Sequence, residues 1–214
     1  MTEPTPEPSP KPIAAPFDAF VGVDVYLIDQ LLKGRVAPGA RVLDAGCGSG
    51  RNLTWFLAQG GYAITAVDPN PEAIYALAER CSSLGVSIPA ADIHATSIED
   101  APLAESSFDL VICNAVLHFA RDTAQFEAML EACWRALRPG GVFFARLATN
   151  IGIEDRVLPL GGGWYRLPDE SDRFLVDEAR LLGLTARLGG TLLEPIKTTV
   201  VQGMRAMTTW VLCK

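Results

Sequence analysis

Residues 41–50 read Arg-Val-Leu-Asp-Ala-Gly-Cys-Gly-Ser-Gly, and this stretch decides the fold of the chain. An apolar run ends at Leu43, and a helical pattern begins near Arg51. A glycine turn between a strand and a helix brings backbone N–H groups close to a nucleotide-like ligand. Glycine suits such a turn because it accepts a positive φ and has no Cβ to hold the ligand away. The glycines predicted to face this ligand are Gly46, Gly48 and Gly50.

A carboxylate at the same turn indicates the charge of the ligand. Asp44 stands at the end of the predicted strand, directly before the glycines. A pyrophosphate prefers a helix N-terminus without a carboxylate beside it, whereas a cationic ligand is stabilised by one. Asn52, at the start of the following helix, is a candidate to contact this ligand or to bond within the turn.

Acidic residues also follow the next two predicted strands. Residues 62–67 form an apolar, β-branched run that ends in Asp68-Pro69, about 20 residues after the glycines, where doubly wound folds bind ribose hydroxyls. Residues 86–91 are predicted as a third strand that ends in Asp92. Asp92 is a candidate either for contact with an adenine amino group or for capping the next turn.

Five ordered segments resemble the class I S-adenosylmethionine-dependent methyltransferases. The first three are residues 42–52, the Val-Asp-Pro-Asn run at 67–70 and the Ala-Asp pair at 91–92. The other two are Phe-Asp-Leu-Val-Ile-Cys-Asn at 108–114 and Leu-Arg-Pro-Gly-Gly-Val-Phe-Phe at 137–144. They occur in the order and at the spacing of that family.

The resemblance implies an α/β fold, a doubly wound three-layer sandwich around a seven-stranded, mostly parallel sheet with an antiparallel C-terminal strand. It implies S-adenosyl-L-methionine as the cofactor and direct in-line transfer of its methyl group to a small-molecule acceptor. The residues implied to hold the cofactor are Asp44, Gly46, Gly48, Gly50, Asn52, Asp68, Pro69, Asp92, Ile93 and Asn114.

The remaining sequence predicts one domain. Prolines at 4, 6, 8, 10, 12 and 16 predict a disordered tail over residues 1–16, and residues 17–214 are predicted as a single methyltransferase domain. Helical spacing favours helices over 23–32, 51–59, 71–84, 123–137 and 177–188. Two β-rich runs around Gln202-Gly203 predict a C-terminal hairpin, which supplies the antiparallel strand.

Composition narrows the classes of partner. The net charge of −7 offers no basic footprint, so no nucleic-acid partner is expected. No apolar run approaches the roughly 18 residues that cross a bilayer, and the chain lacks the pattern of a signal peptide. Five cysteines without a CxxC pair and two histidines predict reduced thiols, no metal site and a cytoplasmic location.

The acceptor is expected beside residues 114–119, at the end of the fourth predicted strand. His118 is the candidate catalytic base there, or else a packing residue that bonds the backbone. The candidates for contact with the acceptor are Tyr26, Arg146, Trp164 and Tyr165. Three glycines precede the two aromatic residues at 164 and 165, a pattern that predicts either a hinged lid or a surface loop anchored by its tryptophan.

Two other classes of function remain open at this point. An NAD-type oxidoreductase shares the strand–turn–helix unit, although its glycines usually run G-x-G-x-x-G, unlike residues 46–50. A protein that binds S-adenosylmethionine without turnover, as a sensor or partner subunit, has the same donor site. The sequence fixes neither the acceptor and its methylated atom nor the oligomeric state.

Overall fold

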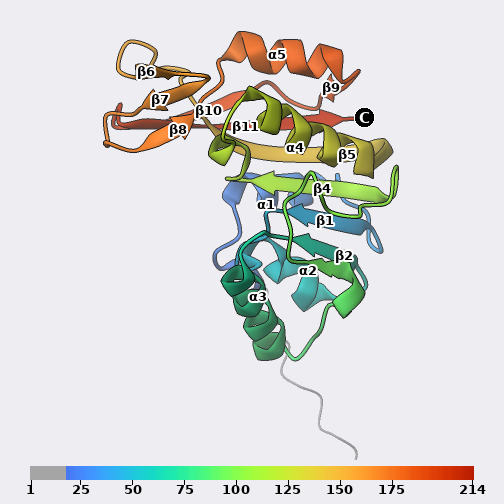
Figure 1. Cartoon of the computed structure of the whole chain (residues 1–214). Coiled ribbons are helices and arrows are strands. Elements are labelled where there is room, and N and C mark those ends of the chain that lie inside the picture. Colours follow the sequence, from blue (N-terminus) through green and yellow to red (C-terminus); the bar gives the residue numbers. More distant parts are fainter. Residues whose placement is uncertain (1–17) are drawn as a thin grey trace, which may run out of the picture.

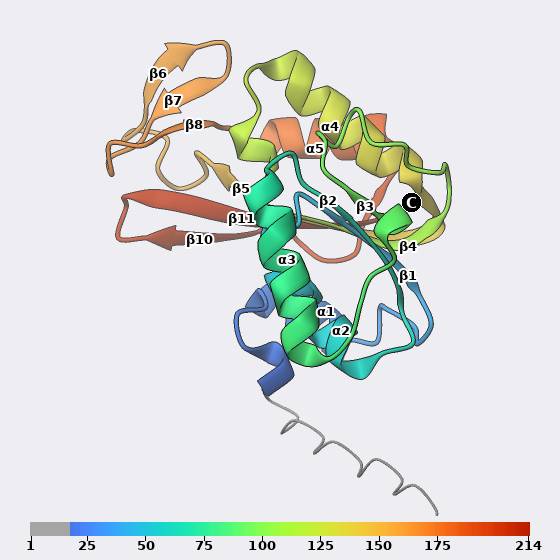
Figure 2. The same ribbon diagram turned by 60° about the horizontal axis from the view of Figure 1, so that its bottom comes forward.

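The computed structural model describes residues 18–214 (Figure 1). The tail predicted over residues 1–16 lies outside the described residues. The described part forms three layers, with helices on both faces of one large sheet (Figures 1 and 2). This architecture confirms the predicted doubly wound sandwich.

The large sheet has the strand order β10-β11-β5-β4-β1-β2-β3, with β9 also paired to β11. Its parallel part joins β1 to β2 and β4, β2 to β3, and β4 to β5. β11 runs antiparallel to β5 and to β10, which confirms the predicted antiparallel strand and hairpin. The strands are β1 (Arg41–Ala45), β2 (Ala63–Val67), β3 (Ile93–His94), β4 (Phe108–Asn114), β5 (Leu137–Thr149), β9 (Thr191–Leu192), β10 (Lys197–Val201) and β11 (Arg205–Cys213).

The helices bury one apolar stripe each against this sheet. Leu27, Phe56 and Leu77 of the first three α-helices pack on one face, and Leu130 and Leu181 of the last two pack on the other. The α-helices are α1 (Val25–Leu32), α2 (Thr54–Gln59), α3 (Pro71–Leu84), α4 (Thr123–Ala136) and α5 (Glu178–Arg187). Short 3₁₀ turns are η1 (Asp18–Phe20), η2 (Arg51–Leu53), η3 (Ala90–Asp92) and η4 (Leu117–Phe119).

Local chemistry sets the helix ends close to their predicted positions. Asn70 caps α3, since its side chain accepts from the backbone N–H of Glu72, and Pro71 takes the first turn. Gly85 ends the same helix in the left-handed conformation. Asp177 caps α5 in the same way as Asn70 caps α3, by accepting from the backbone N–H of Arg180.

The third strand was predicted wrongly. Residues 86–91 are not a strand, and β3 is only the pair Ile93–His94, after the 3₁₀ turn η3. Pro89 is the physical reason, because proline cannot donate a hydrogen bond inside a sheet. Asp92 therefore precedes its strand instead of following it.

A second, three-stranded sheet is formed by the segment that joins β5 to α5 along the chain. It contains β6 (Leu158–Gly161), β7 (Trp164–Arg166) and β8 (Asp172–Phe174), all antiparallel. A small cluster that includes Ile153 and Leu175 packs it onto the end of the large sheet. In Figure 1 this sheet lies at the upper left, where the β10–β11 hairpin also extends.

Three further observations concern partners and cofactors. Among residues 18–214, no helix has the length and apolar character that crossing a bilayer requires. The same residues contain no group of three or more His, Cys, Asp or Glu side chains placed to hold a metal ion. All five cysteines carry free thiols, and every one except Cys213 is buried.

Candidate functional site

A cavity of about 510 Å³ opens where β1, β2 and β4 end, at the carboxyl edge of the parallel strands. Open α/β sheets bind their ligands at this edge, next to the point where strand order reverses. The residues that line the cavity are Gly46, Cys47, Gly48, Ser49, Arg51, Asn52, Asp68, Pro69, Ser97, Ile98, Glu99, Asn114, Ala115, Val116, Phe119, Gln125 and Met129. The predicted site residues fall into two groups, those in this wall and those outside it.

The three glycines of the turn have different reasons to be glycine. All three have positive φ, +83° at Gly46, +52° at Gly48 and +71° at Gly50. A Cβ at Gly46 would lie 2.3 Å from Val116, and a Cβ at Gly50 would lie 2.3 Å from Leu77, so packing excludes larger residues at both. A Cβ at Gly48 would meet nothing within 4 Å. Gly48 therefore leaves bare backbone against open space.

Asp68 is fixed by the turn that it faces. Its Oδ2 accepts from the backbone N–H of Gly48 at 2.8 Å, and its Oδ1 accepts from the backbone N–H of Asn70 at 2.9 Å. Each carboxylate oxygen keeps a further lone pair, because a carboxylate offers about four acceptor positions. Asp68 and Pro69 both line the cavity, so an oriented acceptor faces it from the end of β2.

Asp44 is fully buried on β1, and neither of its carboxylate oxygens has a hydrogen-bond partner among the described residues. Burial raises its pKa to about 7, the charge of Arg51 opposes this rise, and the charge of Asp68 adds to it. Asp44 does not line the cavity, although it lies directly before the glycine turn that does. An unpaired buried carboxyl at this place is suited to a cationic partner.

The structure separates Asp92 and Ile93 from the cavity. Asp92 lies in a smaller second pocket, with Gly60 and Pro89, at the other end of the strands. The wall that the sequence assigned to these two residues is formed instead by Ser97, Ile98 and Glu99, which follow β3. Sequence reasoning missed this segment because it took residues 86–91 as the strand, although Pro89 was a signal against that choice.

Glu99 presents an unused acceptor in that wall. Its Oε1 accepts from Gln125 Nε2 at 2.8 Å, whereas its Oε2 is buried and has no partner in the described part of the chain. Arg121 in turn donates from its backbone N–H and its Nε to Gln125 Oε1. The free oxygen of Glu99 is thus held by a chain of hydrogen bonds.

Asn52 and Asn114 meet at the opposite end of the cavity. Asn52 Oδ1 accepts from Asn114 Nδ2 at 3.4 Å and from the backbone N–H of Asp24 at 3.1 Å. Asn52 therefore both lines the cavity and bonds within the protein. Asn114 Oδ1 remains buried without a partner among the described residues.

His118 is not placed to remove a proton. Its ring is buried outside the residues that line the cavity, and Nδ1 accepts from the backbone N–H of Ala148 at 3.1 Å. In the neutral ring the proton then resides on Nε2, so neither nitrogen offers a lone pair. Burial lowers the pKa of His118 to about 4, and the charge of Arg173 adds to this effect. This geometry favours the alternative in which His118 is a packing residue that bonds the backbone, and it argues against a role as the catalytic base.

Tyr26 and Arg146, both predicted to contact the acceptor, lie against each other beside the cavity. The guanidinium of Arg146 lies 5.2 Å from the centre of the Tyr26 ring, and its Nη1 donates to Asp24 Oδ2 at 2.8 Å. The Tyr26 hydroxyl lies 2.8 Å from Thr199 Oγ1 of β10. Arg146 and Asn114 are paired in register on β5 and β4, which places this cluster beside the cavity without lining it.

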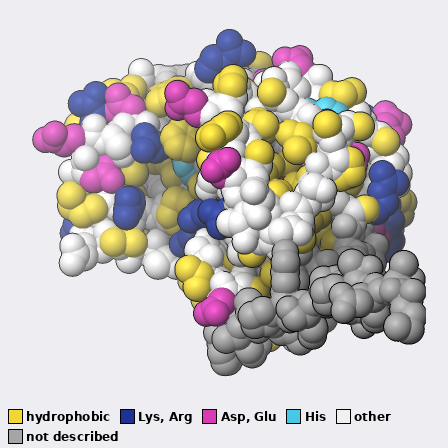
Figure 3. Space-filling view, turned by 90° about the horizontal axis from the view of Figure 1, so that it is seen from below, with side chains coloured by type: hydrophobic (Ala, Val, Ile, Leu, Met, Phe, Trp, Pro, Cys, Tyr) yellow, Lys and Arg dark blue, Asp and Glu magenta, His cyan; other side chains and the backbone are white. Residues whose placement is uncertain are grey.

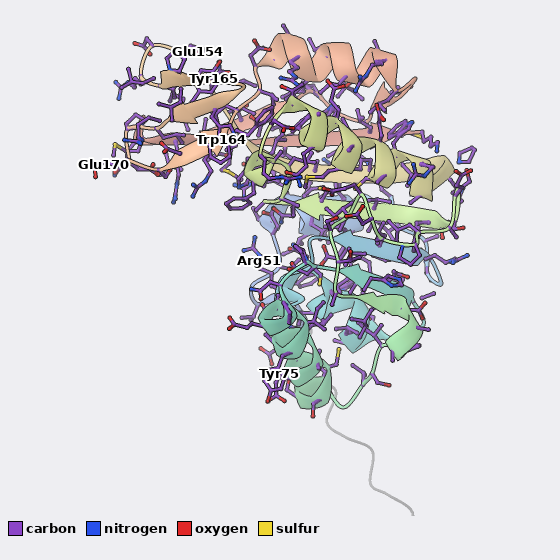
Figure 4. All side chains as sticks on the ribbon, in the orientation of Figure 1. Arg51, Tyr75, Glu154, Trp164, Tyr165 and Glu170 are labelled. Atoms are coloured by element: carbon purple, nitrogen blue, oxygen red, sulfur yellow. The ribbon has the colours of Figure 1, made fainter. Side chains whose placement is uncertain are left out.

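Trp164 and Tyr165 do not face the cavity. Trp164 donates its indole N–H to the backbone oxygen of Arg121 at 2.8 Å and packs against the core under α4. Tyr165 packs on the small cluster that supports β6–β8. Figure 4 shows Trp164 between β8 and α4, with Tyr165 farther out on the small sheet. This segment is therefore a surface loop that is anchored by its tryptophan, and these contacts do not favour a hinged lid.

Comparison with known proteins finds similar sequences among methyltransferases. Residues 43–145 match the family model described as a methyltransferase domain. A ubiquinone biosynthesis O-methyltransferase from Methylocella silvestris is 36% identical over 146 residues, which cover 66% of this chain and 54% of that protein. This chain thus spans about half the length of that curated relative.

Solved structures share the fold. A methyltransferase from Methanosarcina mazei has a TM-score of 0.69 at 19% identity, covering 86% of this chain and 96% of that one. A 1,6-didemethyltoxoflavin-N1-methyltransferase from Burkholderia thailandensis, solved with 1,6-didemethyltoxoflavin and S-adenosylhomocysteine, has a TM-score of 0.62 at 23% identity, covering 95% and 79%. Together with the sequence match over residues 43–145 and the strand order, these findings support the resemblance of the chain to the class I S-adenosylmethionine-dependent methyltransferases in sequence and in fold.

Proposed function

We propose that this protein transfers a methyl group from S-adenosylmethionine to a small-molecule acceptor by direct in-line displacement. The observation that carries the proposal is the pairing of Asp68 with Gly48 across the cavity wall, an oriented carboxylate beside bare backbone. Ribose hydroxyls are the donors that such a carboxylate accepts in doubly wound folds. The named relative that acts in ubiquinone biosynthesis supports a small acceptor.

Other wall residues would contact the remaining parts of the donor. Glu99 Oε2 is suited to the amino group of adenine, since it is an acceptor without a partner in the described chain. Asp44, with Asn114 nearby at the end of β4, would face the ammonium group of the methionine part. In this assignment Asp92 and Ile93 take no part, because they lie away from the cavity.

The chemical demand on the protein is modest. Gly48 and Asp68 would hold the donor, which would supply an activated methyl carbon to the acceptor atom and keep the electron pair of the broken carbon–sulfur bond on its sulfur. The residues of the cavity have to hold the reacting atoms in line and exclude water. A base is required only when the acceptor atom carries a proton at the working pH.

The proposal includes a cytoplasmic location and no nucleic-acid partner. Free thiols, of which all but Cys213 are buried, suit a reducing compartment. The net charge of −7 opposes binding to a phosphate backbone.

The first test compares Asp68→Ala with Asp92→Ala. Loss of the Asp68 carboxylate should weaken S-adenosylhomocysteine binding by at least tenfold, because two charge-assisted hydrogen bonds contribute roughly 1.5–3 kcal/mol each. Asp92→Ala is the matched control and should bind like the wild type. Isothermal titration calorimetry of folded variants makes the measurement, and equal affinity of both variants would refute the assignment.

A second measurement separates the proposal from the two other classes. S-adenosylhomocysteine, and not NADH, should raise the melting temperature, because the Asp44 carboxyl near the turn favours a cationic ligand over a pyrophosphate. Incubation with methyl-labelled donor and cell extract should then label a small molecule. Thermal stabilisation without any transfer of label would indicate a binding protein without turnover.

A further inference from the structure

The mouth of the cavity carries an aromatic ring that is more than half exposed. Phe119 lines the cavity, yet 57% of its surface is exposed. Its position is fixed, because it ends the 3₁₀ turn η4 and its backbone N–H donates to Val116 at 2.9 Å. A large aromatic residue held in this way at a cavity mouth offers a flat apolar surface to a ligand.

A guanidinium group lies over the same ring. The Cζ atom of Arg173, on β8, is 5.2 Å from the centre of the Phe119 ring. Arg173 Nη1 donates to the backbone oxygen of Asp172 at 2.6 Å, which fixes the side chain from the small sheet. The second sheet thus brings a cation to the mouth, although none of its strands lines the cavity.

The charge of Arg173 is not matched by an ion pair in the described part of the chain. Arg146, Arg166 and Arg187 each pair with a carboxylate. Of the acids that precede it closely in sequence, Asp172 binds Arg166 and Asp169 binds Ser171, and Glu170 forms no ion pair with Arg173. The remaining guanidinium N–H groups of Arg173 are therefore available to an anionic partner from outside the described chain.

A second unpaired guanidinium lies in the cavity wall. Arg51 is exposed and forms no ion pair with any residue from 18 to 214. In Figure 4 it projects on the side of the molecule that the β7–β8 strands overhang. Figure 3 shows this side as hollowed, with Lys or Arg, hydrophobic and acidic side chains around the hollow. The net charge of the chain is −7, so the two unpaired cations at this mouth have the opposite sign to the charge of the molecule as a whole.

We propose that the acceptor is a planar ring compound with a carboxylate or similar anionic group, whose ring packs on Phe119 while Arg173 holds the charge. This inference rests on the proposed methyl transfer and specifies its substrate class. A guanidinium is suited to this task because its planar donors match a carboxylate in two parallel hydrogen bonds. The field of Arg51 adds to the attraction of an anion toward the mouth.

His118 supplies no base at this mouth. The ring of His118 has no free lone pair and lies beside Phe119, with ring centres 4.5 Å apart. The carboxylate in this proposal is held by Arg173, so the methylated atom is a separate atom of the ring compound. That atom needs no base where it carries no proton at the working pH.

The experiment uses matched pairs of probes on the full chain saturated with S-adenosylhomocysteine. Each pair holds a ring carboxylate and its neutral amide: 2-hydroxybenzoate with 2-hydroxybenzamide, indole-3-carboxylate with its amide, and quinoline-2-carboxylate with its amide. Dissociation constants are measured by ligand-observed NMR titration. We expect at least one carboxylate to bind about tenfold more tightly than its amide.

Two variants assign the preference to the mouth. Arg173→Gln keeps a polar side chain of similar length and should abolish the preference for the carboxylate, while its affinity for S-adenosylhomocysteine stays within about twofold of the wild type. Arg135→Gln, an exposed arginine on α4 that pairs with Glu105, is the control and should keep the preference. Phe119→Ala should weaken the carboxylate and the amide of each pair alike, because both lose the ring surface.

The outcomes of the two proposals are distinguishable. Failure of the wild type to bind S-adenosylhomocysteine would overturn the proposed methyl transfer itself. Normal binding of S-adenosylhomocysteine, combined with equal binding of carboxylates and amides or no binding of any probe, would overturn the anionic acceptor alone. A carboxylate preference that survives in Arg173→Gln would also overturn it.

Discussion

At the scale of single residues, the site depends on where polar atoms find partners. Asp68 is oriented by two backbone N–H groups, and His118 accepts from one. Asp44 has no partner for either oxygen in the described chain. The three side chains therefore differ in their capacity to accept a further hydrogen bond. The sequence alone identifies each of them only as a titratable residue.

His118 provides a test at this scale. His118→Asn places an amide oxygen where Nδ1 accepts from Ala148, so it should keep activity within about threefold of the wild type. His118→Leu leaves that buried N–H unpaired and should lower the free energy of unfolding by about 1–3 kcal/mol. Methyl-transfer kinetics and urea unfolding measure the two effects. A hundredfold loss of kcat in His118→Asn would restore the catalytic base.

The pH dependence of stability tests the burial of Asp44. Its pKa rises from the ordinary value of 3.8 to about 7 on folding. Below pH 3.8 both states are protonated, whereas between pH 3.8 and 7 the folded state keeps a proton that the unfolded state has released. Stability therefore falls as pH rises through this window and stays reduced above pH 7.

Asp44→Asn removes this dependence while it keeps the shape of the side chain. The variant should become more stable than the wild type as pH rises from 4.5 to 7.5, and it should bind S-adenosylhomocysteine more weakly at pH 7.5. Urea unfolding at a series of pH values measures the difference in free energy. A constant difference across that range would mean that Asp44 is ionised in the folded protein throughout.

At the scale of elements, one turn and one short strand shape the wall of the cavity. The turn between β1 and η2 is tied to β2, because the N–H groups of Gly46 and Cys47 both donate to the Val67 oxygen. This tie brings Asp68, the next residue, against Gly48. β3 is so short that the segment after it, at Ser97, reaches the cavity wall.

Two substitutions separate packing from ligand binding in this turn. Gly46→Ala should lower the free energy of unfolding most, because its Cβ would lie 2.3 Å from Val116. Gly48→Ala meets no atom within 4 Å, so it should cost only the roughly 1–2 kcal/mol of a left-handed residue. Its new methyl group would occupy the space of the ligand. Calorimetry should show at least tenfold weaker S-adenosylhomocysteine binding for Gly48→Ala, and unchanged affinity would place the ligand elsewhere.

At the scale of the whole molecule, the large sheet carries the proposed donor part of the site, and the small sheet β6–β8 shapes the other part. The cavity wall comes from the ends of the parallel strands and the segments after them. The small sheet β6–β8 lies beyond these ends and brings Arg173 over Phe119 (Figure 1). One chain thus places acids at the donor end of the cavity and unpaired cations at its mouth.

The sequence by itself determined the glycine turn, the acid after β2, the helix ends and the C-terminal hairpin. These features depend on neighbours within a few residues, such as the cap at Asn70 and the tight turn at Gln202-Gly203, so local chemistry specifies them. The position of Asp68 relative to the glycines belongs to the same class, because one strand–helix–strand unit sets it.

Only the tertiary structure decided the partners of each side chain. It formed the third wall of the cavity from Glu99 instead of Asp92, packed the partly buried Trp164 against the core, and gave the Nδ1 lone pair of His118 a backbone N–H partner. It also formed β6–β8, whose strands are too short for alternation to reveal. The physical reason is that packing and hydrogen bonding join residues that are far apart in the chain, as the contact of Arg173 with Phe119 does. The pattern of neighbouring residues in the sequence does not predict such contacts.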